Sequence, residues 1–376
     1  MAYQERWAAA ELAPWRRRGL TRASLRDRVD AAAANHGGAF RYDVSRTGVV
    51  LHDKPGAFLG AHVPPEITRE VAARAESYRA LLEQSLPLLH IGQAFSLVID
   101  VSDLPPRIAD LPLFSFQKPL GADLILLPDI DLLRLGFLED EQWVDRVAFS
   151  DKINKAIFVG SSTGGHITRE QIETLALPRL RAAVFFKGNP HVAFTLPKIV
   201  QYDTQETQRL VEGLGVGGPP LSWDEQLGCR HILSMDGNGA TCSRVAIALN
   251  SNSVLMKYDS PHHLFYFKGL RPSVHYVAIN DDSDVEPLVV DSARDMRRYS
   301  RIGADGRRFF HNHLRRDRCI EYVAALLQAY LEILNHGEGA TGANLRARTH
   351  YDIMRTRRLA GRGWRFLRDR LQMRPT

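Results

Sequence analysis

The sequence predicts an α/β protein in which two parallel-sheet domains face each other across a cleft. The chain has 376 residues, more than a single hydrophobic core usually supports, and this length suits two domains of about 150–200 residues. Apolar residues make up 44% of the chain, which is enough for globular folding. Segments typical of strands and helices alternate in both halves, as in parallel sheets covered by helices. We place the domains at residues 1–150 and 151–336, because the composition turns polar around 140–151.

The first half is expected to begin with helices over residues 1–36. A β-hairpin follows, since polar and apolar residues alternate on both sides of Thr47-Gly48. Pro64-Pro65 then opens a helix with apolar residues at helical spacing. This helix is expected over residues 64–89, and two apolar strands are expected after it, at residues 95–101 and 124–128.

The second half is expected to begin with a strand over residues 155–160. A loop at residues 213–220 holds four glycines and two prolines and is expected on the surface. The other predicted elements are helices at 168–175 and 317–335, strands at 182–186, 253–257 and 274–279, and a short helix after the glycine-bearing residues 236–240.

Residues 236–244, named the glycine turn below, carry the sequence Asp-Gly-Asn-Gly-Ala-Thr-Cys-Ser-Arg. A glycine-bearing turn that runs into a helix presents free backbone N–H groups, and Arg244 adds a fixed cation. Together they suit an anionic group such as a diphosphate. Glycines also precede ordinary core helices, so the spacing alone leaves both interpretations open.

Asp103 follows the end of the apolar strand predicted at 95–101. Ligand sites in open α/β sheets lie outside the carboxyl ends of strands, which places Asp103 well for a site in the cleft. A Ser-Asp pair before Leu-Pro-Pro is also ordinary turn chemistry, so a purely local role is the alternative.

Several ordered motifs resemble glycosyltransferase family 90, and the resemblance covers residues 40–335. Asp103-Leu104-Pro105 is followed by a Phe-Ser-Phe-x-Lys segment that ends at Lys118. The segment from Phe158 to Arg169 resembles the family's Phe-Arg-Gly-Ser…Arg motif, and the glycine turn ends in the family's Ser-Arg. The signature Leu-x-Pro-x-x-His-Tyr-x-x-Ile is matched by Leu270, Pro272, His275, Tyr276 and Ile279.

The resemblance implies a GT-B-type architecture of two facing Rossmann-like domains. It implies an inverting, metal-independent transfer of a sugar from a nucleotide donor, expected to be a UDP-sugar, to an acceptor hydroxyl. A carboxylate takes the proton as the hydroxyl attacks, and cations and N–H donors stabilise the departing diphosphate. No cofactor is expected, since the UDP-sugar is a co-substrate.

The resemblance assigns the catalytic base to Asp103. It assigns donor contacts to six further positions, which are Ser161, Arg169, Asn238, Gly239, Ser243 and Arg244. A donor-sugar contact by Asp129 is a further expectation. The chain departs from the family where Ser102 and Val159 replace arginines and where Leu264 replaces a glutamate.

Two other interpretations of these motifs are weaker. The segment after Phe158 lacks the Gly-x-Gly-x-x-Gly of a dinucleotide site. Asp129-Ile130-Asp131 has the Asp-x-Asp spacing of metal-dependent glycosyltransferases, but carboxylates at this spacing usually cap helices or face solvent. No metal site is therefore predicted. The three cysteines are too few and too widely spaced for a disulfide framework or a zinc site.

The charge of +6 is concentrated in residues 337–376, where ten arginines oppose three acidic residues. Apolar residues are interspersed there, so this basic tail is expected either to contact an anionic membrane or to pack on the protein body. No nucleic-acid module is recognised. The N-terminus lacks the apolar core of a secretory signal, and no apolar run is long enough to span a membrane. A cytoplasmic location, peripheral to the membrane, is expected.

These observations favour a saccharide or glycolipid acceptor, such as a lipopolysaccharide core or another envelope glycan. A protein O-glycosyltransferase acting on serine is the alternative enzyme, and a catalytically degenerate binding protein of the same fold is the alternative without activity.

Overall fold

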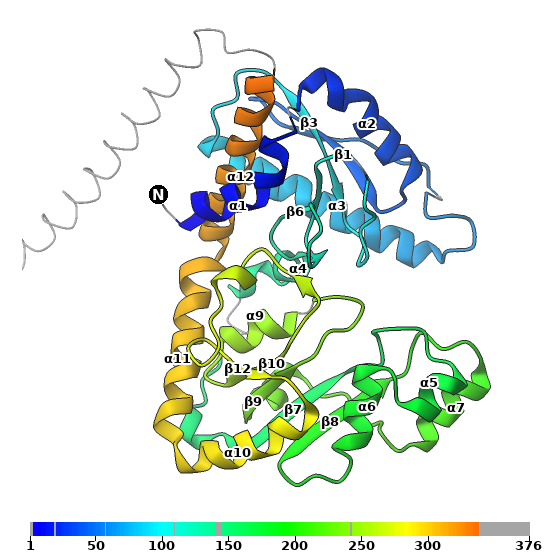
Figure 1. Ribbon diagram of the computed structural model, residues 1–376, viewed down its shortest axis with the longest axis vertical. Coiled ribbons are helices and arrows are strands. Elements are labelled where there is room, and N and C mark those ends of the chain that lie inside the picture. Colours follow the sequence, from blue (N-terminus) through cyan, green and yellow to red (C-terminus); the bar gives the residue numbers. More distant parts are fainter. Residues whose placement is uncertain are drawn as a thin grey trace, which may run out of the picture.

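The computed structural model describes residues 3–18, 20–56, 58–108, 110–139, 144–240 and 243–337. Two five-stranded sheets lie in two lobes, one above the other in Figure 1. The strands of the first sheet fall within residues 39–126 and those of the second within residues 153–279. These two lobes, each with its own sheet and helices, confirm the expected two-domain α/β class. The basic tail expected at 337–376 lies almost wholly outside the described residues.

The first sheet has the strand order β2-β1-β3-β4-β6. β1 pairs antiparallel with β2 and β3, whereas β3, β4 and β6 run parallel. The sheet is therefore mixed and not wholly parallel, because a short hairpin turn joins antiparallel strands. The elements of this lobe are α1 (Tyr3–Arg16), α2 (Arg22–Asn35), β1 (Ala39–Val44), β2 (Val49–Leu51), α3 (Pro65–Ser85), β3 (Phe95–Asp100), β4 (Leu113–Ser115), β6 (Ile125–Leu126) and α4 (Ile130–Arg134).

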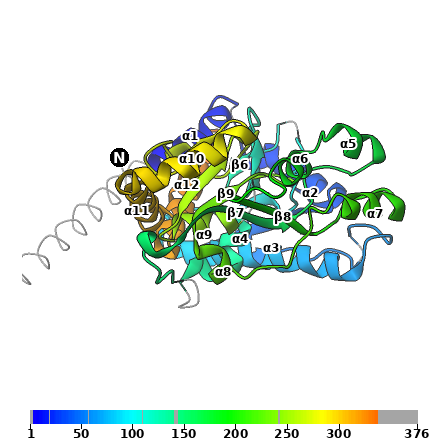
Figure 2. The same cartoon turned by 90° about the horizontal axis from the view of Figure 1, so that it is seen from below.

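The second sheet has the order β12-β10-β9-β7-β8, and all its strands run parallel. Helices cover both faces, as Figure 2 shows with α6 and α10 on one side and α8 and α9 on the other. The elements are β7 (Ile153–Ser161), α5 (Arg169–Thr174), α6 (Pro178–Phe185), β8 (Val192–Lys198), α7 (Gln205–Gly213), α8 (Trp223–Leu227), β9 (Cys229–Ser234), α9 (Ser243–Leu249), β10 (Val254–Tyr258), β12 (Val277–Ile279), α10 (Val285–Arg294) and α11 (Met296–His313).

One predicted strand is wrong. Residues 182–185 belong to the helix α6, which starts at Pro178, and Phe186 is its C-cap. Proline suits the first turn of a helix, and the apolar residues that follow are those of a buried helix. Leu180, Ala182 and Ala183 are buried in the core of the second lobe, so this continuous apolar run is the buried face of a helix and not a strand.

The last described helix returns to the first lobe. α12 (Arg316–Gly337) packs on α1 and α3, although the expected division counted its residues with the second domain. In Figure 1, α12 and α1 lie side by side at the edge of the first lobe. One hydrophobic cluster extends from the first sheet through α12 to α9 and to Phe265 and Tyr266 of the second lobe, so apolar packing joins the two lobes.

Two polar connections reinforce this junction. β5 (Lys118–Pro119) of the first lobe pairs with β11 (His262–His263) of the second. The buried carboxylate of Glu11 on α1 pairs with Lys118 at 2.6 Å and with Lys268 of the second lobe at 2.5 Å.

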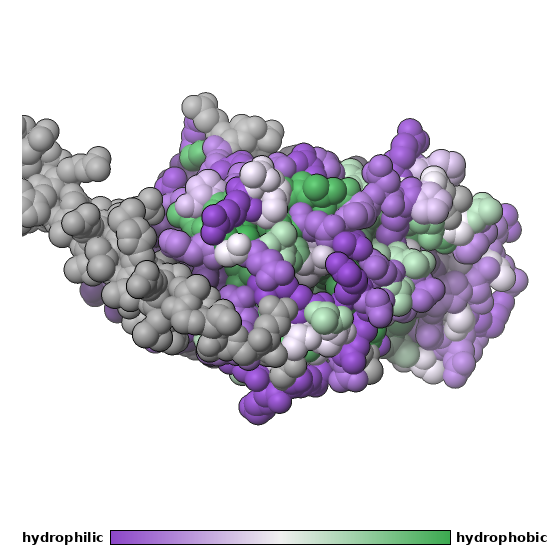
Figure 3. All heavy atoms as spheres, turned by 90° about the horizontal axis from the view of Figure 1, so that it is seen from above, coloured by the Kyte–Doolittle hydropathy of each residue, from purple (hydrophilic) through white to green (hydrophobic). Residues whose placement is uncertain are grey.

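The far end of the first lobe, seen from above in Figure 3, is covered mostly by hydrophilic residues with small hydrophobic areas between them. Within the described part of the chain, none of the helices combines the length and the apolar character that crossing a membrane requires.

Candidate active site

Polar residues follow three neighbouring parallel strands of the first sheet. Asp103 follows β3, Gln117 follows β4, and Asp129 follows β6. The carboxyl ends of parallel strands meet at one edge of a sheet, which is where α/β proteins bind ligands. This edge faces the second lobe, where the glycine turn follows β9.

Asp103 lies between the two lobes. Its Oδ1 accepts a hydrogen bond from Nη1 of Arg74 at 3.0 Å, and its Oδ2 lies 3.5 Å from Nδ2 of Asn238 in the glycine turn. The side chain of Gln117 donates to the backbone carbonyl of Asp103. The Asp103 side chain keeps 40% of its surface exposed, so it is both positioned and accessible.

The glycines of the turn allow close approach between the lobes. A Cβ on Gly239 would lie 2.2 Å from Oε1 of Gln117, and a Cβ on Gly237 would lie 2.5 Å from Oγ1 of Thr163. These distances are far shorter than any real carbon contact, so only glycine fits at either position without movement of its neighbours. The turn thus packs between the loop after β7 and the edge of the first sheet.

The loops after three strands of the second sheet meet at the glycine turn. Gln201, after β8, donates to Oδ1 of Asn238 at 2.9 Å. Ser161 ends β7, and its hydroxyl lies 3.3 Å from that of Thr163. The predicted donor-contact residues Ser161, Asn238 and Gly239 are therefore brought into one region.

Arg179 of α6 joins these loops, and sequence reasoning missed it. Its buried guanidinium donates to the carbonyls of Ser161, Met235 and Asp236 and to the hydroxyl of Thr163, at 2.7–3.0 Å. No spacing in the sequence distinguishes this arginine, because its partners are mostly backbone carbonyls of distant loops.

Arg244 is buried beneath the same loops. Its guanidinium donates to the carbonyl of Val159 at 2.6 Å and to Oε1 of Gln226 at 3.0 Å. The guanidinium carbon lies 4.4 Å from the ring centre of Phe158 and 5.1 Å from that of Trp223, within the range of cation–π attraction. Arg244 of the glycine turn thus contacts Phe158 and Val159, which belong to the segment from Phe158 to Arg169.

Arg169 lies apart from these residues. It is the first residue of α5, its side chain is 57% exposed, and it pairs with Glu206 of α7. None of the contacts among the described residues joins Arg169 to the glycine turn or to Asp103.

Asp129 and Asp131 lie at the start of α4. Oδ1 of Asp129 caps this helix by accepting from the backbone N–H of Asp131 at 2.8 Å. Oδ2 of Asp131 accepts from the backbone N–H of Ser243 at 3.0 Å, so a carboxylate of the first lobe meets the start of α9. Burial and the charge of Asp131 hold the pKa of the Asp129 carboxyl well above its usual range. Among the described residues, no three histidine, cysteine or acidic side chains form a group able to hold a metal ion.

Gln117 is a further residue at this site that the sequence analysis did not select, although the sequence pattern indicates it. Gln117 follows an apolar strand in the same way as Asp103, so the reasoning that selected Asp103 also selects Gln117. Arg74 carries no such signal, because it lies inside α3 and reaches Asp103 only through tertiary packing.

Residues 112–339 match the family model of Glycosyl transferase family 90. This match covers more than half of the chain and includes the glycine turn, the segment after β7 and Gln117. The chain belongs to glycosyl transferase family 90. The resemblance inferred from the motifs is thereby confirmed, and with it a glycosyltransferase.

The C-terminal domain of a glycosyl transferase group 1 family protein (LpcC) from Francisella tularensis is 12% identical, with a TM-score of 0.25. The similarity covers 42% of this chain and 83% of that chain. No curated protein sequence matches the chain.

Proposed function

We propose that this family 90 glycosyltransferase moves a sugar from a UDP-linked donor to a hydroxyl of a saccharide acceptor with inversion, using Asp103 as the base. The observation that carries the proposal is the position of Asp103. Its accessible carboxylate follows the carboxyl end of β3 and lies 3.5 Å from Asn238 of the opposite lobe. A base in that position serves an acceptor held on the first lobe and a donor held on the second.

The proposed reaction is a single displacement. The acceptor hydroxyl oxygen attacks the anomeric carbon on the face opposite the diphosphate, and its proton passes to the carboxylate of Asp103. The new C–O bond forms as the bond from the anomeric carbon to the diphosphate oxygen breaks, and UDP departs with that electron pair. Arg74 fixes the direction of the Asp103 carboxylate through its 3.0 Å hydrogen bond.

The donor is proposed to lie along the loops after β7 and β9, where Ser161, Asn238 and Gly239 lie together. Ser243 and Arg244 are proposed to meet the diphosphate, and Asp129 to contact the sugar. Arg179 supports this site indirectly, since it fastens both loops through their carbonyls. Arg169 is also proposed to contact the donor, because it matches the arginine of the family motif. To do so it would have to leave its ion pair with Glu206.

The acceptor is proposed to be a lipopolysaccharide core or another envelope glycan, reached from the cytoplasmic side of a membrane. What supports this is the basic composition of residues 337–376, which suits contact with anionic lipid. That segment lies outside the described residues, apart from Gly337, so composition alone carries this part of the proposal.

A binding and turnover screen tests the proposal. Purified protein is mixed with UDP-glucose, UDP-galactose, UDP-xylose or GDP-mannose in the presence of EDTA, and binding and slow hydrolysis are measured. One UDP-sugar is expected to bind and to be hydrolysed, Asp103→Asn to bind it without turnover, and Arg244→Lys to bind it more weakly. Binding without any Asp103-dependent turnover would indicate a degenerate binding protein. Absence of binding to every nucleotide sugar would overturn the transferase proposal for this chain.

A further inference from the structure

His262 lies on the rim of the candidate active site. It belongs to β11, where it pairs with Pro119 of the first lobe, and its side chain contacts the carboxylate of Asp236. Pro119 is two residues beyond Gln117, and Asp236 is two residues before Asn238. The side chains of Gln117 and Asn238 both contact the proposed base, and two residues span at most about 7 Å. His262 therefore lies beside the space between the lobes.

Asp236 and Ser260 fix the orientation of the His262 ring. Nδ1 of His262 lies 3.4 Å from Oδ2 of Asp236, and the hydroxyl of Ser260 donates to the same oxygen at 2.5 Å. The Ser260 oxygen also accepts from the backbone N–H of His262 at 3.0 Å. A carboxylate only accepts hydrogen bonds, so Nδ1 carries the proton and Nε2 of the neutral ring is an acceptor.

Nε2 of His262 is open to a ligand. In the part of the chain that the structure describes, this nitrogen has no hydrogen-bond partner, and it is not one of the unpaired atoms that are fully buried. The side chain as a whole keeps 19% of its surface exposed. The ring is therefore held through Nδ1 and is accessible at Nε2.

The groups around His262 suit a sugar hydroxyl better than a diphosphate. An ionised diphosphate offers only acceptor oxygens, so the carboxylate of Asp236 and an acceptor at Nε2 are both unfavourable neighbours for it. A hydroxyl group can donate to Nε2. The guanidinium of Arg244 lies instead at the carbonyl of Val159 in β7, whereas Asp236 and Ser260 follow β9 and β10. Different strands of the second sheet thus carry the group that suits a diphosphate and the groups that suit a hydroxyl.

We propose that His262 selects the donor sugar by accepting a hydrogen bond at Nε2 from one of its hydroxyl groups. This inference rests on the proposed function, since it requires a UDP-sugar between the lobes. Asp236 and Ser260 act through His262, as residues that position its ring. A sugar without a hydroxyl at that place leaves Nε2 unpaired, so His262 contributes to specificity.

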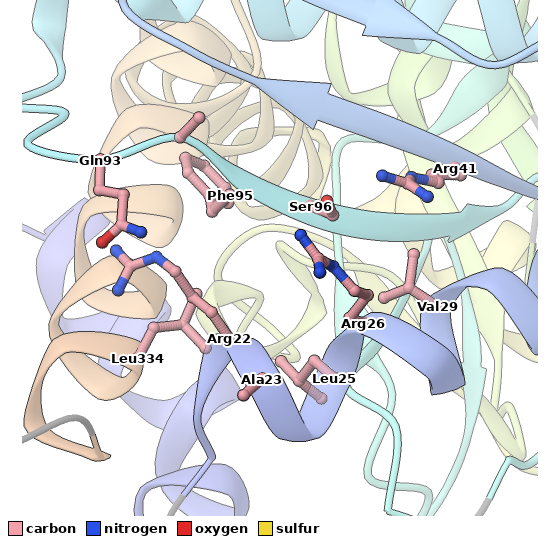
Figure 4. Close-up of a pocket in the computed structure, with 11 residues that line it drawn as sticks. Arg22, Ala23, Leu25, Arg26, Val29, Arg41, Gln93, Phe95, Ser96 and Leu334 are labelled. Atoms are coloured by element: carbon pink, nitrogen blue, oxygen red, sulfur yellow. The ribbon is translucent and has the colours of Figure 1, made fainter.

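His52 provides a matched control for His262. It also contacts an aspartate, since Nε2 of His52 lies 2.7 Å from Oδ2 of Asp43. Asp43 lies opposite Ser96 in the pairing of β1 with β3, and Ser96 lines a pocket of about 450 Å3 on the first lobe (Figure 4). This pocket is at the start of β3, whereas Asp103 follows the end of that strand. Loss of the His52 imidazole therefore removes a similar contact at a distance from the active site.

Calorimetry on the full-length protein compares the binding of UDP with that of UDP-glucose, UDP-galactose and UDP-xylose. The variants are His262→Ala, which removes the imidazole, and His262→Gln, whose amide oxygen can take the place of Nε2. His262→Ala is expected to weaken binding of the preferred UDP-sugar about tenfold, the effect of one hydrogen bond, and to leave the Kd of UDP unchanged. His262→Gln is expected to restore part of this loss, and His52→Ala to bind both ligands like the wild type.

The comparison of UDP with UDP-sugars separates this inference from the proposed function. If the wild type binds none of the UDP-sugars, both are overturned. If the wild type binds one of them and His262→Ala binds it equally well, only the role of His262 is overturned. The role of His262 is also overturned if both of its variants lose UDP and UDP-sugar binding to the same extent, because the imidazole then only supports the glycine turn. A variant that still binds UDP has kept a folded donor site.

Discussion

The side-chain amide of Asn238 lies 3.5 Å from the carboxylate of Asp103, and these two residues belong to opposite lobes. Asn238 lies in the glycine turn after β9, and Asp103 lies just beyond β3. The contact therefore joins the carboxyl edges of the two sheets, which is the position at which a donor and an acceptor can meet.

Asp103→Asn is expected to lower turnover of the donor by about 10²–10⁴-fold while donor binding is retained, because an amide cannot accept the proton as a general base. Turnover and UDP-sugar binding are measured on the same preparation. Asp53→Asn is the control, since Asp53 is exposed and distant in sequence from the site. Equal turnover of Asp103→Asn and the wild type would exclude Asp103 as the base.

Gly239→Ala is expected to destabilise the protein by about 1–3 kcal/mol, because the added methyl group overlaps the side chain of Gln117. The free energy of unfolding is measured in urea. Gly217→Ala is the control, since a Cβ at Gly217 meets no atom within 4 Å. A double-mutant cycle with Gln117→Ala is expected to show a favourable coupling, because the smaller side chain leaves room for the methyl group.

Arg179→Ala is expected to cost about 2–4 kcal/mol of stability and to raise the KM for the donor, because buried carbonyls of two site loops lose their donor. Arg169→Ala, which removes an exposed ion pair, is expected to change stability by less than about 1 kcal/mol. Urea unfolding and donor kinetics are compared for both variants. A larger stability loss in Arg169→Ala than in Arg179→Ala would contradict this assignment.

Asp129→Asn is expected to remove a pH-dependent penalty. Burial and the charge of Asp131 raise the pKa of the Asp129 carboxyl, so the folded state favours the protonated form. The free energy of unfolding of the wild type therefore falls as the pH rises from 3.8, the ordinary pKa of an aspartate, through the raised pKa of Asp129. Asparagine also caps helices, so the variant is expected to have the higher melting temperature at pH 7.5 and to lose this advantage near pH 4. A variant that is less stable at pH 7.5 than at pH 4, relative to the wild type, would contradict the assignment.

Glu11→Gln is expected to cost about 1–3 kcal/mol at neutral pH, because the partly exposed ammonium groups of Lys118 and Lys268 lose their buried counter-charge. Burial opposes ionisation of Glu11, but Lys118 and Lys268 outweigh it and lower the pKa of its carboxyl. The stabilisation that the Glu11 carboxylate provides is therefore complete above pH 4.5, the ordinary pKa of a glutamate. It is lost as the pH falls through the lowered pKa of Glu11. Urea unfolding at several pH values measures it, with the exposed Glu173→Gln as control. Equal losses in the two variants would show that the buried cluster is not stabilising.

The sequence by itself determined the class of the fold and the family. Alternation of apolar strands with helices predicts the sheets, since the side-chain period within one element depends only on local backbone geometry. The same local logic selected Asp103, because it follows an apolar strand. It failed at 182–186, where a short apolar run fits a buried helix as well as a strand.

Only the tertiary structure decided which residues surround Asp103 and which arginines are buried. Arg74 and Gln117 reach Asp103 through packing within the first lobe, and Asn238 reaches it only when the two lobes pack together. Arg179 holds two loops, whereas Arg169, which matches the family motif, pairs with Glu206 at the surface. Residues of one motif are neighbours because they are adjacent in the sequence. Contacts between loops depend on how the sheets and helices pack, and no local pattern of residue types predicts that packing.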